Sequence, residues 1–259
     1  MISVIIVSLN TKDDFLETIK SIISQTKKIE MIVVDGSSTD GTIEVINKYS
    51  NFFDKIIIEK DEGIYFAMNK GIRSASKEWV YFLNSGDIFF NNKTIENITE
   101  ILQQNKEVDV VVGNSLVKRK NYYVKSPRLN INNYRVNSCF SHQSTFTKRY
   151  LLNLYPFDTK FKYCSDFDFY LKLFKLKKKF IYIDQLISIN KDGGISDRNK
   201  IEVFLEFKKI IIKQNKNFFN VLKINFIIFF NLMKQIVKFL IPNSITEKII
   251  YLLEKKNKN

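Results

Sequence analysis

Residues 31–42 read MIVVDGSSTDGT, an apolar run that ends in a cluster of small, hydroxyl-bearing and acidic residues. The run at 31–34 is short and rich in β-branched side chains, which is typical of a parallel strand buried on both faces. Asp35 to Thr42 then combine turn-forming residues with residues that begin helices. A carboxylate at such a strand end can accept hydrogen bonds from a nucleobase or from ribose hydroxyls. Taken alone, however, the segment is better explained as a turn with an Asp helix cap.

The same order of strand, turn and helix recurs on both sides of this segment. Apolar runs predict further strands at 3–8, 55–59, 79–83 and 108–112, and helical spacing predicts helices at 13–25, 42–49, 64–76 and 92–104. This alternation predicts an α/β sandwich around a mainly parallel sheet. Ligands bind beyond the carboxyl ends of such strands, where both Asp35 and Asp87 stand, so we expect the two to converge.

The remainder of the first 199 residues is less regular. Residues 114–165 interleave Tyr and Asn and predict mixed strands and loops, followed by a helix at 166–175 and a strand at 180–189. We therefore expect one catalytic domain at 1–199 and a separate tail at 200–259.

Composition limits the kinds of partner and metal. The formal net charge of +14 favours an anionic partner, such as nucleic acid, an anionic membrane or a phosphorylated substrate, unless the lysines are simply solvated. The single His142 excludes a multi-histidine zinc centre, so a metal would need oxygen ligands, which favours Mg²⁺ or Mn²⁺.

Cysteine usage and the apolar runs suggest a cytoplasmic location. Cys139 and Cys164 have neither zinc-site spacing nor a disulfide framework, and we expect two buried free thiols in a reducing compartment. The N-terminus lacks the pattern of a signal peptide, and no apolar run approaches the length of a membrane-spanning helix.

Three further segments carry candidate chemistry. In LNSGD at 83–87, Asp87 can supply a carboxylate to a divalent cation and Asn84 can hold a ribose, although this sequence is also a common turn. In DEGIYFAMNKGI at 61–72, Lys70 and Arg73 can reach a phosphate. In YCSDFDFYLKL at 163–173, two acids open an apolar helix, where the helix dipole stabilises carboxylates and a general base would be useful.

Together these segments, in this order, resemble the large family 2 of inverting glycosyltransferases of bacterial polysaccharide and lipopolysaccharide biosynthesis. The resemblance covers about residues 1–200 and extends to HQS at 142–144. It implies a GT-A fold, in which a Rossmann-like sheet is sandwiched by helices. It also implies transfer of a sugar from a nucleotide-sugar donor, with a UDP-sugar favoured, to a lipid-linked glycan or a lipopolysaccharide or capsule precursor.

The resemblance also implies roles for single residues. Asp166 matches the catalytic base, with Asp168 in support, and Asp87 matches the metal ligand, although only one carboxylate remains in that motif. Gly193, Gly194 and Ser196 match a flexible loop that closes near the donor. The expected donor-binding residues are Ser8, Asn10, Asp35, Ser37, Asp61, Asn69, Lys70, Asn84 and His142.

The tail is strongly basic, with 12 Lys against 4 Glu in residues 200–259. Plotted as one helix, residues 216–240 place four lysines on one side and an aromatic-rich apolar face on the other. This pattern favours a helix lying on an anionic membrane surface, so we expect a peripheral protein on the inner face of the cytoplasmic membrane. The alternative is a helix that docks on the catalytic domain or on a second subunit of a homo-oligomer. Pro242 should end this helix, and 245–253 predicts another.

Two other functions are alternatives to this hypothesis. A nucleotidyltransferase would prefer a Gly-rich basic loop after the first strand, where this chain has LNTKD at 9–13. A nucleic-acid-binding protein should interleave basic and exposed aromatic residues on one sheet face, whereas here the basic residues concentrate in the tail. We therefore expect no nucleic-acid partner.

Overall fold

A computed structural model describes residues 1–119, 122–125, 141–194 and 199–214. The chain divides into two compact units, Met1–Asn199 and Lys200–Asn259. Cys139, Ser196 and the predicted helices at 216–240 and 245–253 lie outside the described residues.

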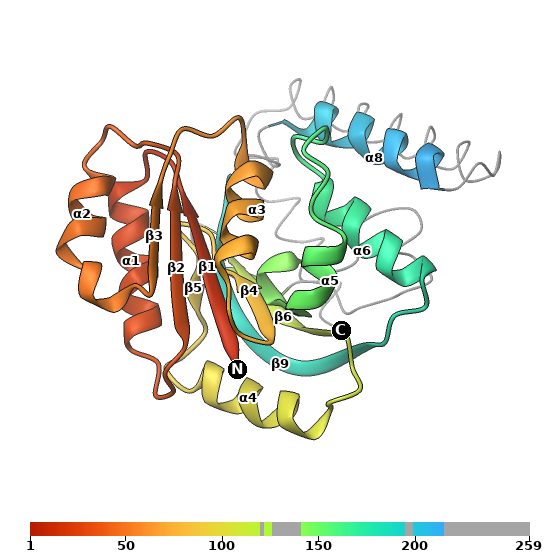
Figure 1. The fold of residues 1–259 in the computed structure, drawn as a ribbon, viewed down its shortest axis with the longest axis horizontal. Coiled ribbons are helices and arrows are strands. Elements are labelled where there is room, and N and C mark those ends of the chain that lie inside the picture. Colours follow the sequence, from red (N-terminus) through yellow and green to blue (C-terminus); the bar gives the residue numbers. More distant parts are fainter. Residues whose placement is uncertain (120–121, 126–140, 195–198, 215–259) are drawn as a thin grey trace. The chain divides into compact units, whose positions relative to one another are not determined.

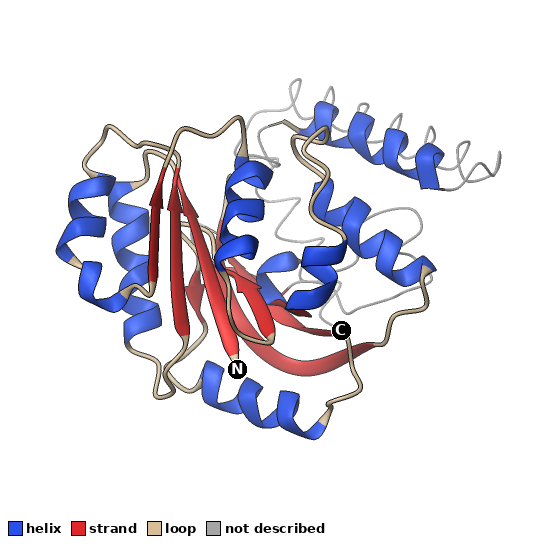
Figure 2. Ribbon diagram, in the orientation of Figure 1, coloured by secondary structure: helices blue, strands red, loops and turns tan. Residues whose placement is uncertain are grey.

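The first unit is built on one sheet with helices on both faces (Figures 1 and 2). The sheet has the strand order β3-β2-β1-β4-β8-β6-β9-β5, and β7 pairs with β6. Its strands are β1 (Ile2–Ser8), β2 (Glu30–Asp35), β3 (Lys55–Ile58), β4 (Trp79–Phe82), β5 (Ile88–Phe89), β6 (Val110–Lys118), β7 (Tyr123–Lys125), β8 (Thr145–Lys148) and β9 (Phe180–Lys191).

The helices of this unit are mostly short and begin just beyond the strands. They are α1 (Lys12–Ile23), α2 (Thr42–Lys48), α3 (Ile64–Ser74), α4 (Thr94–Gln104), α5 (Arg149–Leu154) and α6 (Ser165–Lys175), with 3-10 turns η1 (Ser50–Phe52) and η2 (His142–Ser144). Apolar side chains of α1, α2 and α4 form a buried cluster with alternate residues of β1, such as Val4 and Ile6. Figure 1 shows α3 and α5 on the opposite side of the sheet.

Gly71 explains how α3 lies so close to β1. A Cβ on this residue would stand 2.4 Å from Cγ2 of Ile5, which is fully buried. A glycine inside a helix costs about 1 kcal/mol relative to alanine, and here the close approach of helix and strand offsets that cost. The glycine therefore sets the distance between α3 and the sheet.

The sequence predicted the first half of the sheet better than the second. β3, β2, β1 and β4 are parallel neighbours, as expected, whereas β8 is antiparallel to both β4 and β6, and β5 is antiparallel to β9. Strand β6 runs six residues further than predicted, and α5 is a helix within a segment expected to hold strands and loops. The sequences of these elements show no regular spacing of apolar residues. Their structure depends on contacts with distant elements and not on a local pattern of side chains.

The described part of the second unit is α8 (Lys200–Gln214). Within the described residues, no helix combines the length and the apolar character needed to cross a membrane.

Candidate functional site

The carboxyl ends of β1 and β2 are joined through Asp35. Register pairs Ser8 with Asp35, and the Ser8 hydroxyl donates to Asp35 Oδ2 at 2.7 Å. Ser38 donates to the same carboxylate from its backbone N–H and from its hydroxyl, both at 2.7 Å. Asp35 is fully buried, so in this structure its carboxylate organises the turn that follows β2.

The loop after β1 is tied to the loop after β2. The backbone N–H of Asn10 donates to Ser38 Oγ at 2.8 Å, and Asn10 Oδ1 accepts from the backbone N–H of Thr39 at 2.8 Å. Ser37 lies between these contacts, exposed and with a φ of 66°, a left-handed conformation that a non-glycine residue rarely adopts. The two loops thus form one surface beside the ends of β1 and β2.

Lys70 of α3 sits between two acids that follow β3. Its Nζ forms ion pairs with Asp61 at 2.7 Å and with Glu59 at 2.8 Å. The side chain of Asp61 is only 7% exposed, whereas that of Glu59 is 62% exposed. The hydrogen bonds that Lys70 donates to Asp61 and Glu59 raise the pKa of Lys70, which keeps it protonated. The structure thereby brings two predicted donor-binding residues, Asp61 and Lys70, into direct contact.

The predicted metal motif forms a tight turn beyond β4. The N–H of Asp87 donates to the carbonyl of Asn84 at 2.9 Å, and Gly86 has a φ of 98°. The backbone N–H of Lys191, at the end of β9, donates to Asp87 Oδ1 at 3.0 Å. Its ammonium pairs with Asp14 of α1 at 2.5 Å. The turn is therefore held between α1 and the last residue of β9.

Asp87 is a strongly perturbed acid. It is 5% exposed, and burial raises its pKa to about 6, against a smaller lowering by the Lys191 N–H and by nearby His142. The same turn holds a buried oxygen, Asn84 Oδ1, to which no described residue donates a hydrogen bond. A carboxylate and an amide oxygen are the ligands that Mg²⁺ and Mn²⁺ prefer, so the turn fits such an ion. Within the described ranges, no group of three or more His, Cys, Asp or Glu residues stands ready to bind a metal by itself.

His142 connects this turn to Asp166. Its Nδ1 lies 2.9 Å from Asp166 Oδ2, and its Nε2 lies 3.2 Å from Nδ2 of Asn84. An amide N–H can donate to Nε2 only if that nitrogen carries no proton, so the neutral Nδ1–H tautomer satisfies both contacts. With the amide in this orientation, Asn84 Oδ1 is the oxygen left for a ligand.

Asp166 is held from a second direction by Tyr65 of α3. The Tyr65 hydroxyl is 2.8 Å from Asp166 Oδ1 and 2.9 Å from the carbonyl of Tyr163. Burial alone would raise the pKa of Asp166, but the hydrogen bonds from His142 and Tyr65 outweigh it, so that the pKa is lowered. The carboxylate is therefore ionised at neutral pH and still partly exposed, with a side-chain exposure of 22%.

Several predicted residues lie outside this network. Asn69 pairs both of its amide groups with the backbone of Phe157, at 2.9 and 3.0 Å, and so braces the loop before α6. Asp168 is buried on α6. Gly193, with a φ of 77°, and Gly194 follow β9 directly, two and three residues after the Lys191 that contacts Asp87.

Two residues of the site were missed by sequence reasoning. Tyr65 stands within one of the quoted segments, but its spacing does not distinguish it from a core aromatic residue. Lys191 acts through its backbone N–H, which no side-chain pattern can reveal. Both become visible only when α3 and β9 are placed against Asp166 and Asp87.

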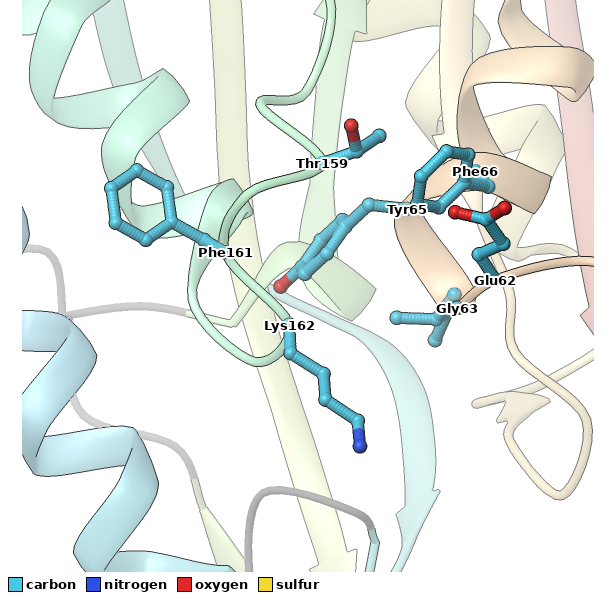
Figure 3. A pocket seen from close by; sticks show the side chains of 8 residues that line it. Glu62, Gly63, Tyr65, Phe66, Thr159, Phe161 and Lys162 are labelled. Atoms are coloured by element: carbon cyan, nitrogen blue, oxygen red, sulfur yellow. The ribbon is translucent and has the colours of Figure 1, made fainter.

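A small pocket opens beside Tyr65, on the side of α3 where the helix begins (Figure 3). It encloses about 240 Å³ between the start of α3 and the loop before α6. Its lining residues are Glu62, Gly63, Ile64, Tyr65, Phe66, Thr159, Phe161 and Lys162.

Comparison with known proteins identifies the family and the fold. The family model described as glycosyl transferase family 2 matches residues 3–175. A PGL/p-HBAD biosynthesis glycosyltransferase of Mycobacterium tuberculosis is 28% identical over 215 residues, which cover 80% of this chain and 83% of the relative.

Solved structures show the same fold at lower identity. The Staphylococcus aureus TarS 1-349 structure in complex with UDP has a TM-score of 0.65 at 19% identity, over 82% of this chain and 64% of that one. The mannosyltransferase PcManGT of Pyrobaculum calidifontis, solved with GDP-Man and Mn²⁺, has a TM-score of 0.64 at 21% identity, over 83% and 64%. This chain thus spans less than two thirds of each solved chain, and the fold they share is GT-A.

Proposed function

The chain belongs to glycosyl transferase family 2, and we propose that it transfers a sugar from a nucleoside-diphosphate sugar to a hydroxyl of a glycan or glycolipid acceptor, with inversion at the anomeric carbon. The observation that carries the proposal is the chain of hydrogen bonds from Asn84 through His142 to Asp166. It joins the turn beyond β4 to an ionised, partly exposed carboxylate on another element.

Asp166 is the general base in this proposal. As the acceptor oxygen bonds to the anomeric carbon, its hydroxyl proton passes to Asp166, and the bond from that carbon to the diphosphate oxygen breaks with its electron pair. Attack from the face opposite the leaving group inverts the configuration. His142 and Tyr65 each donate to one carboxylate oxygen, and the backbone N–H of Phe167 donates to the carboxylate as well, which leaves one lone pair that can accept the proton.

A divalent cation, Mg²⁺ or Mn²⁺, would be held by Asp87 and Asn84 Oδ1 together with oxygens of the diphosphate and water. When bound, it neutralises the negative charge that develops on the leaving diphosphate. The raised pKa of Asp87 supports this assignment, because a cation at that position would relieve the cost of a buried carboxylate.

The donor nucleotide would lie along the ends of β3, β2, β1 and β4. The joined loops at Asn10, Ser37 and Ser38 line this edge, and Lys70, ion-paired with Asp61 and Glu59, lies at its β3 side. The first donor to test is a UDP-sugar, with a GDP-sugar next, because the two solved relatives carry UDP and GDP-Man.

We also propose that the basic tail holds the enzyme on an anionic membrane surface, on the cytoplasmic side where nucleotide sugars and lipid-linked acceptors meet. Residues 200–259 carry a net charge of +8 from 12 Lys and 4 Glu. Each lysine near an anionic leaflet contributes about 1 kcal/mol.

Substitution of the base tests the proposal. Asp166→Asn should lower kcat by about 10²- to 10⁴-fold and leave the donor Kd within twofold, because only the proton acceptor is lost. Release of nucleoside diphosphate from a panel of nucleotide sugars gives the rate, and calorimetry gives donor affinity.

The matched control is Asp13→Asn, which also removes an acid from the first turn of a helix but lies on the exposed side of α1. The control should keep wild-type activity. Near-full activity of Asp166→Asn would contradict the assignment, and so would a product whose anomeric configuration, measured by proton NMR, matches that of the donor.

A further inference from the structure

The pocket beside Tyr65 is separate from the strand ends that would carry the nucleotide. It lies between the start of α3 and the loop at residues 159–162 (Figure 3). Asn69 pins this loop to α3 through its two hydrogen bonds with Phe157, and the rings of Tyr65 and Phe157 pack at 5.4 Å. These contacts therefore hold the two walls of the pocket together in the absence of a ligand.

One wall of the pocket touches the proposed base. Tyr65 lines the pocket with its ring and reaches Asp166 Oδ1 with its hydroxyl at 2.8 Å. A molecule in this pocket is thus separated by one side chain, Tyr65, from the carboxylate proposed to receive its proton.

The lining indicates the chemistry of the occupant. Phe66 offers aromatic surface beside the largely buried ring of Tyr65, whereas Glu62 and Thr159 offer groups that can pair with hydroxyls. Two charges of opposite sign, Glu62 and Lys162, line the pocket, so it has no excess of positive charge that would favour a phosphate. The ammonium of Lys162 lies 5.6 Å from the centre of the Tyr163 ring.

The size indicates a single ring. A volume of about 240 Å³ is below the range of roughly 300–1,000 Å³ that clefts for drug-sized ligands occupy. An uncharged ring with one apolar face and several hydroxyls matches both the size and the lining.

We infer that this pocket binds the terminal sugar ring of the acceptor, packed on Tyr65 and Phe66, and that it selects an uncharged glycosyl acceptor. The inference rests on the proposed function, because it needs Asp166 as the base. It assigns the acceptor side of the site to residues 62–66 and 159–162, apart from the donor edge.

Two variants of the lining test it, one that removes a wall and one that fills the cavity. Phe66→Ala should raise the acceptor KM about 5- to 10-fold, and Thr159→Trp should raise it at least 10-fold. Both should leave the donor KM and the slow hydrolysis of donor by water within twofold of wild type. The acceptor probes are octyl glycosides of glucose, galactose, mannose and N-acetylglucosamine, with octyl phosphate as the anionic comparison. The control is Phe90→Ala, an exposed phenylalanine at the end of β5.

The outcomes separate this inference from the proposed function. If the wild type neither binds nor hydrolyses any nucleotide sugar, the proposed function fails and the inference fails with it. If donor turnover is intact but both variants keep the wild-type acceptor KM, the inference alone is overturned. It is also overturned if no glycoside binds to an enzyme that hydrolyses donor, or if octyl phosphate is the better acceptor-site ligand in saturation-transfer NMR.

Discussion

Asp87 and Asp166 are acids of one site, the first buried and the second partly exposed, and their pKa values shift in opposite directions. Burial dominates at Asp87, where the pKa rises from an ordinary 3.8 to about 6. At Asp166 two side chains donate hydrogen bonds to the carboxylate and its pKa falls. Hydrogen bonds to the charged form offset the loss of solvation, which explains why Asp166 ionises readily while Asp87, held by fewer donors, does not.

The raised pKa of Asp87 predicts a gain in stability when the residue cannot ionise. Between about pH 4 and 6 the folded state binds more protons than the unfolded state, so stability falls as pH rises through this window and stays lower above it. Each pKa unit is worth about 1.4 kcal/mol. Asp87→Asn should therefore raise the free energy of unfolding at pH 7.5 by up to roughly 3 kcal/mol, and by almost nothing at pH 4, as measured by urea denaturation without metal.

The same substitution should abolish any protection by Mg²⁺ or Mn²⁺ against unfolding. Asp13→Asn, at an exposed site, should leave stability unchanged within about 0.5 kcal/mol at both pH values. A wild-type-like response of Asp87→Asn at pH 7.5 would show that Asp87 is not a destabilised carboxylate. If Mg²⁺ or Mn²⁺ still protected the Asp87→Asn variant against unfolding, Asp87 would not be a ligand of the proposed metal.

At the scale of elements, α3 contributes to both sides of the site. It carries Lys70 toward the acids after β3, Tyr65 toward Asp166, and Asn69 toward the loop before α6. The helix can do this because Gly71 lets it lie directly on β1. Its placement relative to the sheet therefore affects donor and acceptor residues together.

Gly71→Ala should destabilise the protein although alanine is the better helix former. The new Cβ would meet the buried Ile5 at 2.4 Å, and overpacking of this kind costs about 1–3 kcal/mol, which exceeds the gain of about 1 kcal/mol in helix propensity. We expect a net loss of roughly 1–2 kcal/mol in thermal or urea unfolding.

Asn97→Ala, on the exposed face of α4, isolates the propensity effect and should be neutral or slightly stabilising. If Gly71→Ala were also neutral or slightly stabilising, the close contact between α3 and β1 would not be a constraint on the fold.

At the scale of the whole molecule, charge is divided unevenly along the chain. The 60 residues from 200 onward carry +8 of the total +14. If the tail lies on a membrane surface, binding to anionic lipid should depend on where these lysines stand in the sequence. If the lysines are simply solvated, only the total charge should affect binding.

Substitution of the lysine stripe distinguishes these two explanations. Replacing Lys216, Lys223, Lys234 and Lys238 with Gln in the full chain should lower binding to vesicles with 30% anionic lipid at least tenfold in a sedimentation assay, because about 1 kcal/mol is lost per lysine near the surface. Donor hydrolysis should persist. Replacing the exposed Lys27, Lys28, Lys55 and Lys60 removes the same charge and should change binding less than twofold. Equal losses in both sets would contradict a specific membrane surface on the tail.

The amino-acid pattern was enough to predict the parallel half of the sheet, because short apolar runs and helical spacing are local signals that adjacent elements share. It also indicated the strand-end loops at Asp35 and Asp87, since polar residues directly after buried strands must gather at one edge. It predicted Cys164 as a buried free thiol, and the structure confirms this.

Which of these residues contact one another depends on how distant elements pack in three dimensions. His142 and Asp166 are 24 positions apart, and Tyr65 and Asp166 are 101 apart, so their hydrogen bonds exist only because η2, α3 and α6 meet at one end of the sheet. β8 and α5 also depend on contacts with distant elements, because their short segments show no regular spacing of apolar residues. Contacts between distant elements produce no regular spacing of residues in the sequence. Strands and helices do produce one, because their side-chain periods of two and 3.6 residues are properties of the backbone.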